Sequence, residues 1–271
     1  MGFRPIVRTI TVNDRDEIKI DVREKFEVLP NAPIVEAVIH WQARSETIQS
    51  HEQFYDKLKK RLEDYPVSHP EHEIKFQAEL GSEGVATNIS HPSWSGFKFT
   101  SEDELHIAQF KRDGFAFSRL KPYNKWTEFA AEAQRLWNVY LELAEPLEVQ
   151  RLGVRFINLI SPVQPERFSD LLTIPPKGPE RMPMPIQGLM HKTTFDIPGN
   201  PYNLNVIQAM QPPLSTQTEG FGLILDIDVF TTQALEPKEE LLKHHLDEMR
   251  WIKDKAFFSF LTEDAIDNFR K

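Results

Sequence analysis

Six ionisable side chains lie in three stretches of the chain that alternate between apolar and polar residues. The stretches are 33–41, 149–156 and 221–229, and the six residues are Glu36, His40, Arg151, Arg155, Asp226 and Asp228. Residues two apart in an extended strand point to the same face, so the ionisable side chains of each stretch lie opposite its apolar ones. Arginine suits the binding of anions because its planar fork matches phosphate and carboxylate. The pattern predicts a sheet with an apolar back face and an ionisable front face, on which the two arginines would hold an anion.

Two other interpretations of these six residues stay open. Opposite charges on neighbouring strands stabilise a sheet by about 0.2–1 kcal/mol per pair, so the set also fits a structural ladder of salt bridges. The carboxylates and the imidazole of His40 are ligands that Mg²⁺ or Mn²⁺ accepts. Two neighbouring arginines argue against a metal, because they neutralise the same carboxylates. We therefore expect a structural charge cluster or an anion site here, and no metal.

A second candidate metal site is the pair His244-His245. Helical spacing places Glu240, His244 and Glu248 on one face, an arrangement that two carboxylates and an imidazole would need to hold a metal. The same spacing is typical of a solvated helix face with His245 half buried, and this is the interpretation that we favour.

Aromatic and basic residues are interleaved between positions 94 and 121. The aromatic residues are Trp94, Phe97, Phe99, Phe110, Phe115 and Phe117, and the basic ones are Lys98, Lys111, Arg112, Arg119 and Lys121. Such interleaving can stack and neutralise single-stranded nucleic acid. An ordinary core sheet with its lysines on the wet side explains the pattern equally, and the acidic composition of the chain favours this second interpretation.

Catalytic and cofactor-binding motifs are missing from the sequence. The chain has no cysteine, which excludes disulfides, cysteine nucleophiles and thiolate zinc sites. It also has no Gly-x-Ser-x-Gly motif, no Walker loop and no dinucleotide fingerprint. We therefore expect no cofactor, and a binding protein rather than an enzyme.

The charge of the chain limits its partners. Its 271 residues include 41 acidic and 32 basic ones, which gives a formal net charge of −9. This acidity argues against broad binding to nucleic acid, which needs a basic surface, and it suits a basic protein partner. No stretch approaches the roughly 20 apolar residues of a membrane span, and the first twenty residues do not read as a signal peptide. We expect a cytoplasmic protein that does not contact a membrane.

The apolar periodicity predicts an α+β fold with two similar halves. The first half should contain a strand at 34–43, a helix at 48–64, strands at 72–80 and 97–100, a hairpin at 105–120 and a long helix at 127–144. The second should contain a strand at 149–160, a short helix at 166–172, a proline-rich excursion at 175–185, strands at 187–196, 202–210 and 221–231, a long helix at 237–258 and a final short helix capped by Thr262.

This order suggests an internal duplication of a unit made of a strand, a helix, antiparallel strands and a long helix. We expect an N-terminal arm or edge hairpin at 1–28, a first half at 29–146 and a second half at 147–271. The strands would form a continuous sheet or two abutting sheets, with the helices packed on one face.

Four blocks of sequence carry a family resemblance. They are Asn31-Ala32-Pro33-Ile34-Val35-Glu36-Ala37-Val38, Arg151-Leu152-Gly153-Val154-Arg155-Phe156-Ile157-Asn158, Leu225-Asp226-Ile227-Asp228-Val229-Phe230, and Ala256-Phe257-Phe258 with Leu261-Thr262-Glu263. In this order, over about residues 29–269, they resemble the signature blocks of a sporadically distributed, uncharacterised family of prokaryotic proteins. The resemblance implies no activity. The patchy distribution of the family is typical of mobile genes, including toxin–antitoxin and antiviral defence genes.

The sequence therefore predicts a non-catalytic binding or regulatory module that recognises a partner protein or a small anionic ligand. Neutralisation of a basic toxin and a part in phage defence both fit this prediction. One alternative is an enzyme acting on a phosphate-bearing substrate, with Arg151 and Arg155 as clamps and Glu36 or Asp226 as base. Another is a nucleic-acid-binding regulator that uses the aromatic hairpin.

Overall fold

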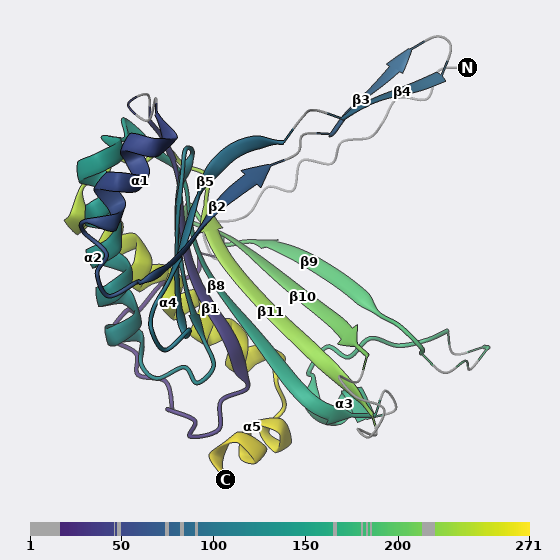
Figure 1. Ribbon diagram of the computed structural model, residues 1–271. Helices are drawn as coiled ribbons and strands as arrows, with labels where there is room; N and C mark the ends of the chain where they lie inside the picture. The colour runs from purple at the N-terminus through teal and green to yellow at the C-terminus, as the bar shows by residue number, and fades with distance from the viewer. Residues whose placement is uncertain are drawn as a thin grey trace.

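The main body of the fold is one antiparallel sheet. The computed structural model describes residues 17–45, 47, 50–73, 76–81, 84–89, 92–164, 167–179, 181–182, 184, 186–212 and 220–271. Over these residues, nine strands pair in the order β2-β5-β6-β7-β1-β8-β11-β10-β9 (Figure 1). The strands are β1 Ile34–Arg44, β2 Val67–Glu73, β5 Ser93–Thr100, β6 His106–Lys111, β7 Gly114–Leu120, β8 Glu148–Val163, β9 Met190–Asp196, β10 Asn203–Gln211 and β11 Phe221–Thr231. A separate hairpin consists of β3 Phe76–Gly81 and β4 Gly84–Ile89. The chain thus has one continuous main sheet rather than two abutting ones.

The helices that contact this sheet cover one of its faces. The described helices are α1 His51–Lys59, α2 Trp126–Ala144, α3 Phe168–Leu171, α4 Glu239–Phe260 and α5 Glu263–Arg270. α1 packs on β5, α2 on β7, and α4 on β8 and β11, and all three lie on the same side of the sheet in Figure 1. We call this side the back face and the opposite side the front face. No helix in the described part of the chain combines the length and the apolarity needed to cross a membrane.

Aromatic residues fill the layer between the back face and α2. The ring of Trp41 stacks on that of Trp137 at 5.2 Å, and Trp137 stacks on Tyr140 at 5.3 Å. All three side chains are fully buried. Burial of a large apolar side chain stabilises a fold by about 1.5–3 kcal/mol, so this layer anchors the first half of the sheet. The long helix predicted at 127–144 from its apolar periodicity is confirmed as α2.

Several element bounds differ from the predicted ones. The helix expected at 48–64 spans only His51–Lys59, and it begins after Ser50, whose side chain accepts a hydrogen bond from the Gln53 backbone N–H. The strand expected at 72–80 is divided between β2 and β3, and β4 was not expected. Pro70 lies inside β2, where it is tolerated because β2 is an edge strand of the sheet. Thr262 caps α5 as predicted, by accepting a hydrogen bond from the Ala265 N–H.

The described part of the predicted N-terminal segment is an arm rather than a hairpin. Residues 17–28 form no strand, and this segment is fastened to α4. The ring of Phe26 stacks on Phe258 at 5.8 Å, and Glu24 accepts hydrogen bonds from Lys255 Nζ at 2.6 Å and Trp251 Nε1 at 2.7 Å. These contacts hold the arm beside the C-terminal half of α4.

The strand order shows how the two predicted halves meet. β1 and β8 are the first strands of their halves, and they pair with each other at the centre of the sheet. In each half the last strand lies next to the first, since β7 pairs with β1 and β11 pairs with β8. Of the nine strands in the main sheet, five come from the first predicted half and four from the second, and the separate β3–β4 hairpin also belongs to the first.

Candidate functional site

The six predicted site residues lie on the front face. β8 lies between β1 and β11, and its register places Arg155 opposite Val38 on one side and Asp228 on the other. Directly opposed residues of antiparallel strands share a face, and residues two apart along a strand do too. The members of this front-face network are therefore Glu36, His40, Arg151, Arg155, Asp226 and Asp228. The structure thus brings together residues from three strands that are distant in sequence.

Arg155 and Asp226 form a two-pronged ion pair. Nε of Arg155 donates to Oδ1 of Asp226 at 2.8 Å, and Nη2 donates to Oδ2 at 2.6 Å. The side chain of Asp226 is only 6% exposed, whereas that of Arg155 is 47% exposed. The hydrogen bonds to Asp226 raise the pKa of Arg155 above its usual value, although burial opposes them. The carboxylate of Asp226 therefore depends on Arg155 for compensation of its charge.

Arg151 lies flat over Gly153. Its Nη2 donates to Oδ2 of Asp228 at 2.9 Å, its Nη1 is 3.3 Å from Nδ1 of His40, and its Cζ lies 4.6 Å from the ring centre of Phe230. His40, Gly153 and Phe230 occupy one row across the three strands. A Cβ on Gly153 would lie 2.7 Å from Nη1 of Arg151, so the missing side chain makes room for the guanidinium.

His40 is uncharged at neutral pH in this setting. Burial, followed by the nearby charges of Arg151 and Lys111, lowers the pKa of His40 to about 4. A neutral imidazole has a free acceptor nitrogen, which suits the guanidinium donor beside it. The carboxylate partners of the two arginines are Asp228 for Arg151 and Asp226 for Arg155, so both guanidinium charges are compensated within the front-face network.

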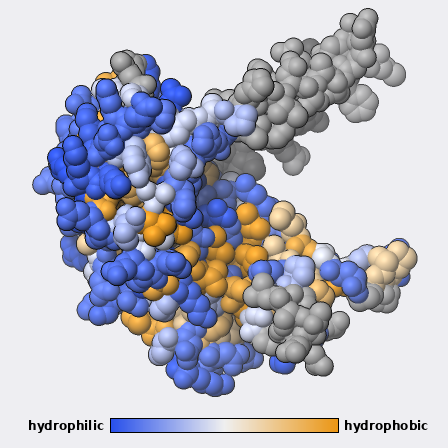
Figure 2. Space-filling view, viewed as in Figure 1, coloured by the Kyte–Doolittle hydropathy of each residue, from blue (hydrophilic) through white to orange (hydrophobic). Residues whose placement is uncertain are grey.

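The front face also carries apolar side chains, which the sequence did not lead us to expect. Ile157 lies opposite Asp226, which in turn faces Ile207, and Leu159 lies opposite Ile224. These four apolar side chains are half buried. Figure 2 shows apolar surface over the region of β8, β11 and β10. The prediction of an ionisable front face is therefore only partly right, because charged and apolar residues share it.

The histidine pair of α4 takes part in a buried contact. The hydroxyl of Tyr202 lies 2.6 Å from Nδ1 of His245, and it donates a hydrogen bond to Glu248. His244 lies 3.5 Å from the same Glu248. Tyr202 is fully buried, so this contact joins α4 to the chain just before β10. The described residues contain no group of three or more metal-ligating side chains placed to hold a metal.

The interleaved aromatic residues belong to the core. Phe97, Phe99, Phe110, Phe115 and Phe117 are each at most 5% exposed. Their rings pack on one another, on α1 and on α2; for example, Phe115 lies 6.4 Å from Trp137. These five rings belong to the core, as the core interpretation predicted, whereas Trp94 is half buried and packs beside His51 and Phe97; nucleic-acid binding by this region stays a prediction.

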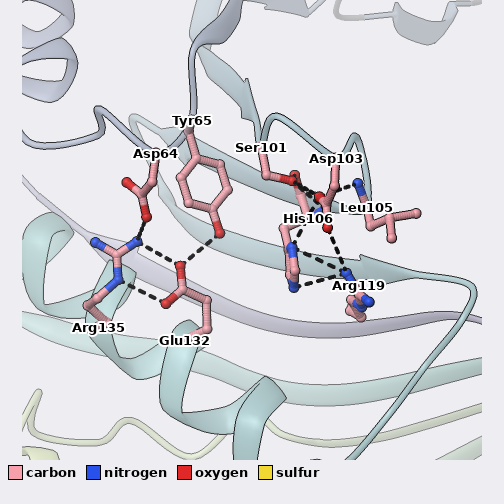
Figure 3. Close-up of polar contacts among 9 residues, drawn as sticks. All are labelled: Asp64, Tyr65, Ser101, Asp103, Leu105, His106, Arg119, Glu132 and Arg135. Atoms are coloured by element: carbon pink, nitrogen blue, oxygen red, sulfur yellow. Dashed lines mark hydrogen bonds and ion pairs between the residues drawn. The ribbon is translucent and has the colours of Figure 1, made fainter.

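Two polar clusters lie near the start of β6 and between α2 and the segment that joins α1 to β2 (Figure 3). In the first, Arg119 donates to the His106 ring and lies 3.6 Å from Asp103. In the second, Tyr65 donates to Glu132 at 2.8 Å, and Arg135 donates to the same carboxylate. Burial acts to raise the pKa of Glu132, but these hydrogen bonds outweigh it and lower the pKa. In both clusters the arginine is paired with a carboxylate of the same cluster, Asp103 in the first and Glu132 in the second, which is typical of structural contacts.

A pocket that sequence reasoning missed lies between α4, β8, the residues before β1 and the loop before α2. It is a cavity of about 360 Å³. Six aromatic residues supply much of its wall: Phe26, Tyr123, Trp126, Phe156, Phe257 and Phe258. Its polar members include Asn158, Arg250, Lys253 and Asp254, and its rim also carries Lys125 and Glu27, the latter paired with Arg270. Pockets of about 300–1,000 Å³ with apolar walls and a few polar groups are typical sites for small ligands.

The charged end of the pocket holds two cations and one carboxylate. Lys253 donates a hydrogen bond to Asp254, and Nε of Arg250 lies 3.5 Å from the same Asp254. Nζ of Lys253 also lies 3.9 Å from the ring centre of Phe156. Burial lowers the pKa of Lys253, and the carboxylate of Asp254 opposes that effect. One positive charge at this end is therefore left without a matching negative one from these three residues.

Asn158 is a buried amide residue in the wall of the pocket. Its Nδ2 donates to the backbone oxygen of Leu225 at 2.9 Å, and the residue is 1% exposed. Within the described part of the chain, its Oδ1 has no hydrogen-bond partner. Six other buried polar atoms of the described residues share this state, among them Nε1 of Trp41 and of Trp137 in the aromatic layer, so the unpaired Oδ1 does not by itself mark a ligand site.

Two local signals in the sequence could have drawn attention to the polar residues of this pocket, although not to the pocket itself. Asn158 interrupts an inward-facing series, Leu152, Val154, Phe156 and Ile160, which is otherwise apolar. Lys253 lies four residues after Met249 and four before Phe257, on the buried stripe of α4. Neither signal says which other segments complete the wall.

Comparison with known proteins adds no relative: no protein-family model matches the chain, and no curated protein matches it.

Proposed function

We propose that the chain is a binding module that holds a small ligand with an anionic group in the pocket beside α4. The observation that carries this proposal is the charged end of the pocket, where Lys253 and Arg250 share Asp254. An anionic group placed there would supply the missing negative charge, and its contacts with Lys253 would be strong because the side chain is only 11% exposed.

The size and walls of the pocket favour a small molecule over a macromolecule. The cavity of about 360 Å³ lies at the lower end of the range for small-ligand sites. Its cationic group is recessed among aromatic rings, where a phosphate backbone does not reach. The net charge of −9 also disfavours a polyanion, whereas a single small anion needs only the local positive charge.

The family resemblance supports the same location. Three of its four sequence blocks supply residues to the pocket wall: Ala32 and Ile34 from the first, Phe156 and Asn158 from the second, and Phe257 and Phe258 from the last. The remaining block supplies the backbone oxygen of Leu225, which fixes the amide of Asn158. The blocks thus lie apart in sequence and meet around one cavity.

We also infer that the two halves arose by duplication of one unit. The equivalent positions of β1 and β8, of β7 and β11, and of α2 and α4 support this inference. The charged pocket belongs to the second half, because Lys253 and Asn158 have no charged or amide counterpart among the buried residues of α2 and β1. The proposed ligand site is then a specialisation of one half.

Binding is tested with a panel of small aromatic anions and their uncharged counterparts. The anions are 4-hydroxyphenylacetate, indole-3-acetate and phenyl phosphate, measured by calorimetry and by thermal shift. We expect at least one anion to bind the wild-type chain, and Lys253→Met to weaken it by tenfold or more. The matched control is Lys243→Met, which removes an exposed lysine of the same helix and should leave binding unchanged. If no anion of the panel binds the wild-type chain, or if both variants bind it equally well, the proposal is wrong.

A further inference from the structure

We propose that two copies of this chain pair through β9, so that their main sheets join into one across a two-fold axis at Thr194. This interaction surface is independent of the pocket and of its ligand. Three features of β9 carry the inference: an open edge, a row of backbone groups that point away from the sheet, and two charged side chains that match those of a second copy.

β9 is an edge strand of the main sheet (Figure 1). Among the described strands it pairs with β10 alone, and six of its seven residues are exposed. The opposite edge strand, β2, contains Pro70, a residue that hinders the pairing of an exposed edge with a further strand. β9 contains no proline, so its backbone is able to pair along its whole length.

The hydrogen bonds at both ends of β9 show which of its backbone groups point outward. Just before β9, the Leu189 oxygen accepts a hydrogen bond from the Met210 N–H at 3.0 Å. Just after β9, the Ile197 N–H donates to the Tyr202 oxygen at 3.1 Å. In an antiparallel pair, residues bonded to the neighbouring strand alternate with residues directed away from it, so the odd-numbered residues of β9 bond β10. The residues whose N–H and C=O groups face the open edge are Met190, Lys192, Thr194 and Asp196.

The charges on this outward row are self-complementary. Lys192 and Asp196 lie two residues before and two residues after Thr194; both are exposed, and within the described residues neither forms an ion pair. A two-fold axis at Thr194 places Lys192 of each copy directly opposite Asp196 of the other, and such opposed pairs contribute about 0.2–1 kcal/mol each. A lone lysine on an edge strand discourages pairing, whereas here a second copy supplies its counter-charge. The charge pattern therefore favours a second copy over an unrelated strand.

The same charges set the position of the axis. An axis at Thr193 would oppose Lys192 to Thr194, and an axis at Lys192 would oppose two lysines, which is destabilising. With the axis at Thr194, the outward row of one copy meets that of the other in about six backbone hydrogen bonds. Phe195, which is 36% exposed, then lies opposite Thr193 of the second copy, a favourable pairing of an aromatic with a β-branched side chain.

Exchange of the two charges tests the pairing and its register together. Lys192→Asp places two like-charge pairs across the axis, and Asp196→Lys does the same with the opposite sign. Each variant alone should dimerise about tenfold more weakly than the wild-type chain. An equimolar mixture of the two variants should recover the dimer, because every lysine then faces an aspartate of the other variant. Sedimentation velocity at concentrations from about 1 μM to about 0.3 mM measures these equilibria.

Two further variants separate the edge of β9 from general effects. Thr194→Pro removes an outward N–H at the axis and keeps the bonds to β10, so it should abolish the dimer while the monomer stays folded. The matched control is Lys57→Asp, which makes the same change of charge on an exposed residue of α1. Because α1 packs on β5, near the other edge of the sheet, this control should leave the dimer unchanged.

Three results would overturn the proposal. The first is a wild-type chain that stays monomeric over the whole concentration range. The second is a dimer that both charge variants leave as strong as before, and the third is a mixture of the two variants that fails to recover the dimer. If Thr194→Pro does not fold, the charge variants and their mixture still decide.

Discussion

Replacement of Lys253 by methionine should make the folded chain more stable while it abolishes ligand binding. A buried ammonium costs free energy, because burial removes it from water. Functional sites commonly carry such a cost, and removing the functional group then raises stability. Lys253 is suited to this test because its carboxylate partner keeps a second cation: Arg250 lies 3.5 Å from Asp254. The substitution therefore leaves no buried carboxylate unpaired.

The size of the effect follows from the contacts of Lys253. Replacement of a whole buried ion pair by apolar residues of similar volume is neutral or stabilising by about 1–4 kcal/mol, and the same range applies here because Arg250 keeps Asp254 paired when Lys253 is removed. The substitution also loses the contact of Nζ with the Phe156 ring at 3.9 Å, an interaction worth about 0.5–2 kcal/mol. We expect a net gain of about 1–2 kcal/mol in the free energy of unfolding. For a chain of this size, that gain corresponds to a rise in Tm of about 2–6 °C.

The pH dependence gives a second, independent readout. Burial lowers the pKa of Lys253 in the folded chain below its usual 10.5, the value that it keeps in the unfolded chain. Between the lowered pKa and 10.5, the unfolded chain binds more protons, so this group makes the wild-type chain more stable as the pH rises. The stability advantage of Lys253→Met should therefore shrink as the pH is raised toward 10.5. Urea unfolding of both chains at several pH values between neutral and alkaline measures this change.

A matched substitution separates burial from loss of charge. Lys243 lies exposed on α4, so Lys243→Met should change stability by less than about 0.5 kcal/mol and should not alter its pH dependence. The reasoning is refuted if Lys253→Met destabilises the chain at neutral pH. In that case Lys253 is a structural cation held by Asp254 and Phe156, and the pocket has no strained charge to offer a ligand.

Two further predictions concern the front-face network. Arg155→Ala should lower the free energy of unfolding, measured in urea, by about 2–3 kcal/mol, because it leaves the carboxylate of Asp226, which is only 6% exposed, without its partner. The double variant Arg155→Ala with Asp226→Leu should regain much of that stability. An unchanged stability of the single variant would contradict this prediction. The pKa of His40 is about 4 in the folded chain and 6.5 in the unfolded chain, so the wild-type chain should lose stability as the pH falls from 6.5 to 4. Thermal melts of His40→Gln over the same pH range should lack this loss. An equal dependence of Tm on pH in both chains would contradict the lowered pKa of His40.

Alternation along the sequence was sufficient to predict the faces of the central strands. Ala37, Ile39 and Trp41 are fully buried on the back of β1, and Leu225, Ile227 and Val229 on the back of β11. This success is expected, because a period of two residues is a local property that needs no knowledge of the partner strand. The pairing of the arginines with the aspartates was also implied by complementary charge, although the register that sets the pairs was not.

The pocket was not predictable in the same way. Its wall joins Leu29 and Ile34, the loop at Tyr123 and the C-terminal half of α4, and no local pattern places these segments side by side. The short extent of α1 and the β3–β4 hairpin were missed for a related reason. A helix pattern over 48–64 says where apolar residues recur, but the cap at Ser50 and the packing on β5 decide where the helix forms.

The front-face network and the pocket are linked through β8, because they use its two opposite faces. Arg151 and Arg155 point to the front, whereas Phe156 and Asn158 point to the back and line the pocket. A shift of one residue in the pairing of β8 would move every side chain to the other face, and would place Asn158 in solvent and Arg155 in the core. The ion pairs from β8 to Asp226 and Asp228 form only in the observed register, so they oppose such a shift. We infer that the charged residues that first drew attention to the front face serve the chain by holding the wall of the pocket in place.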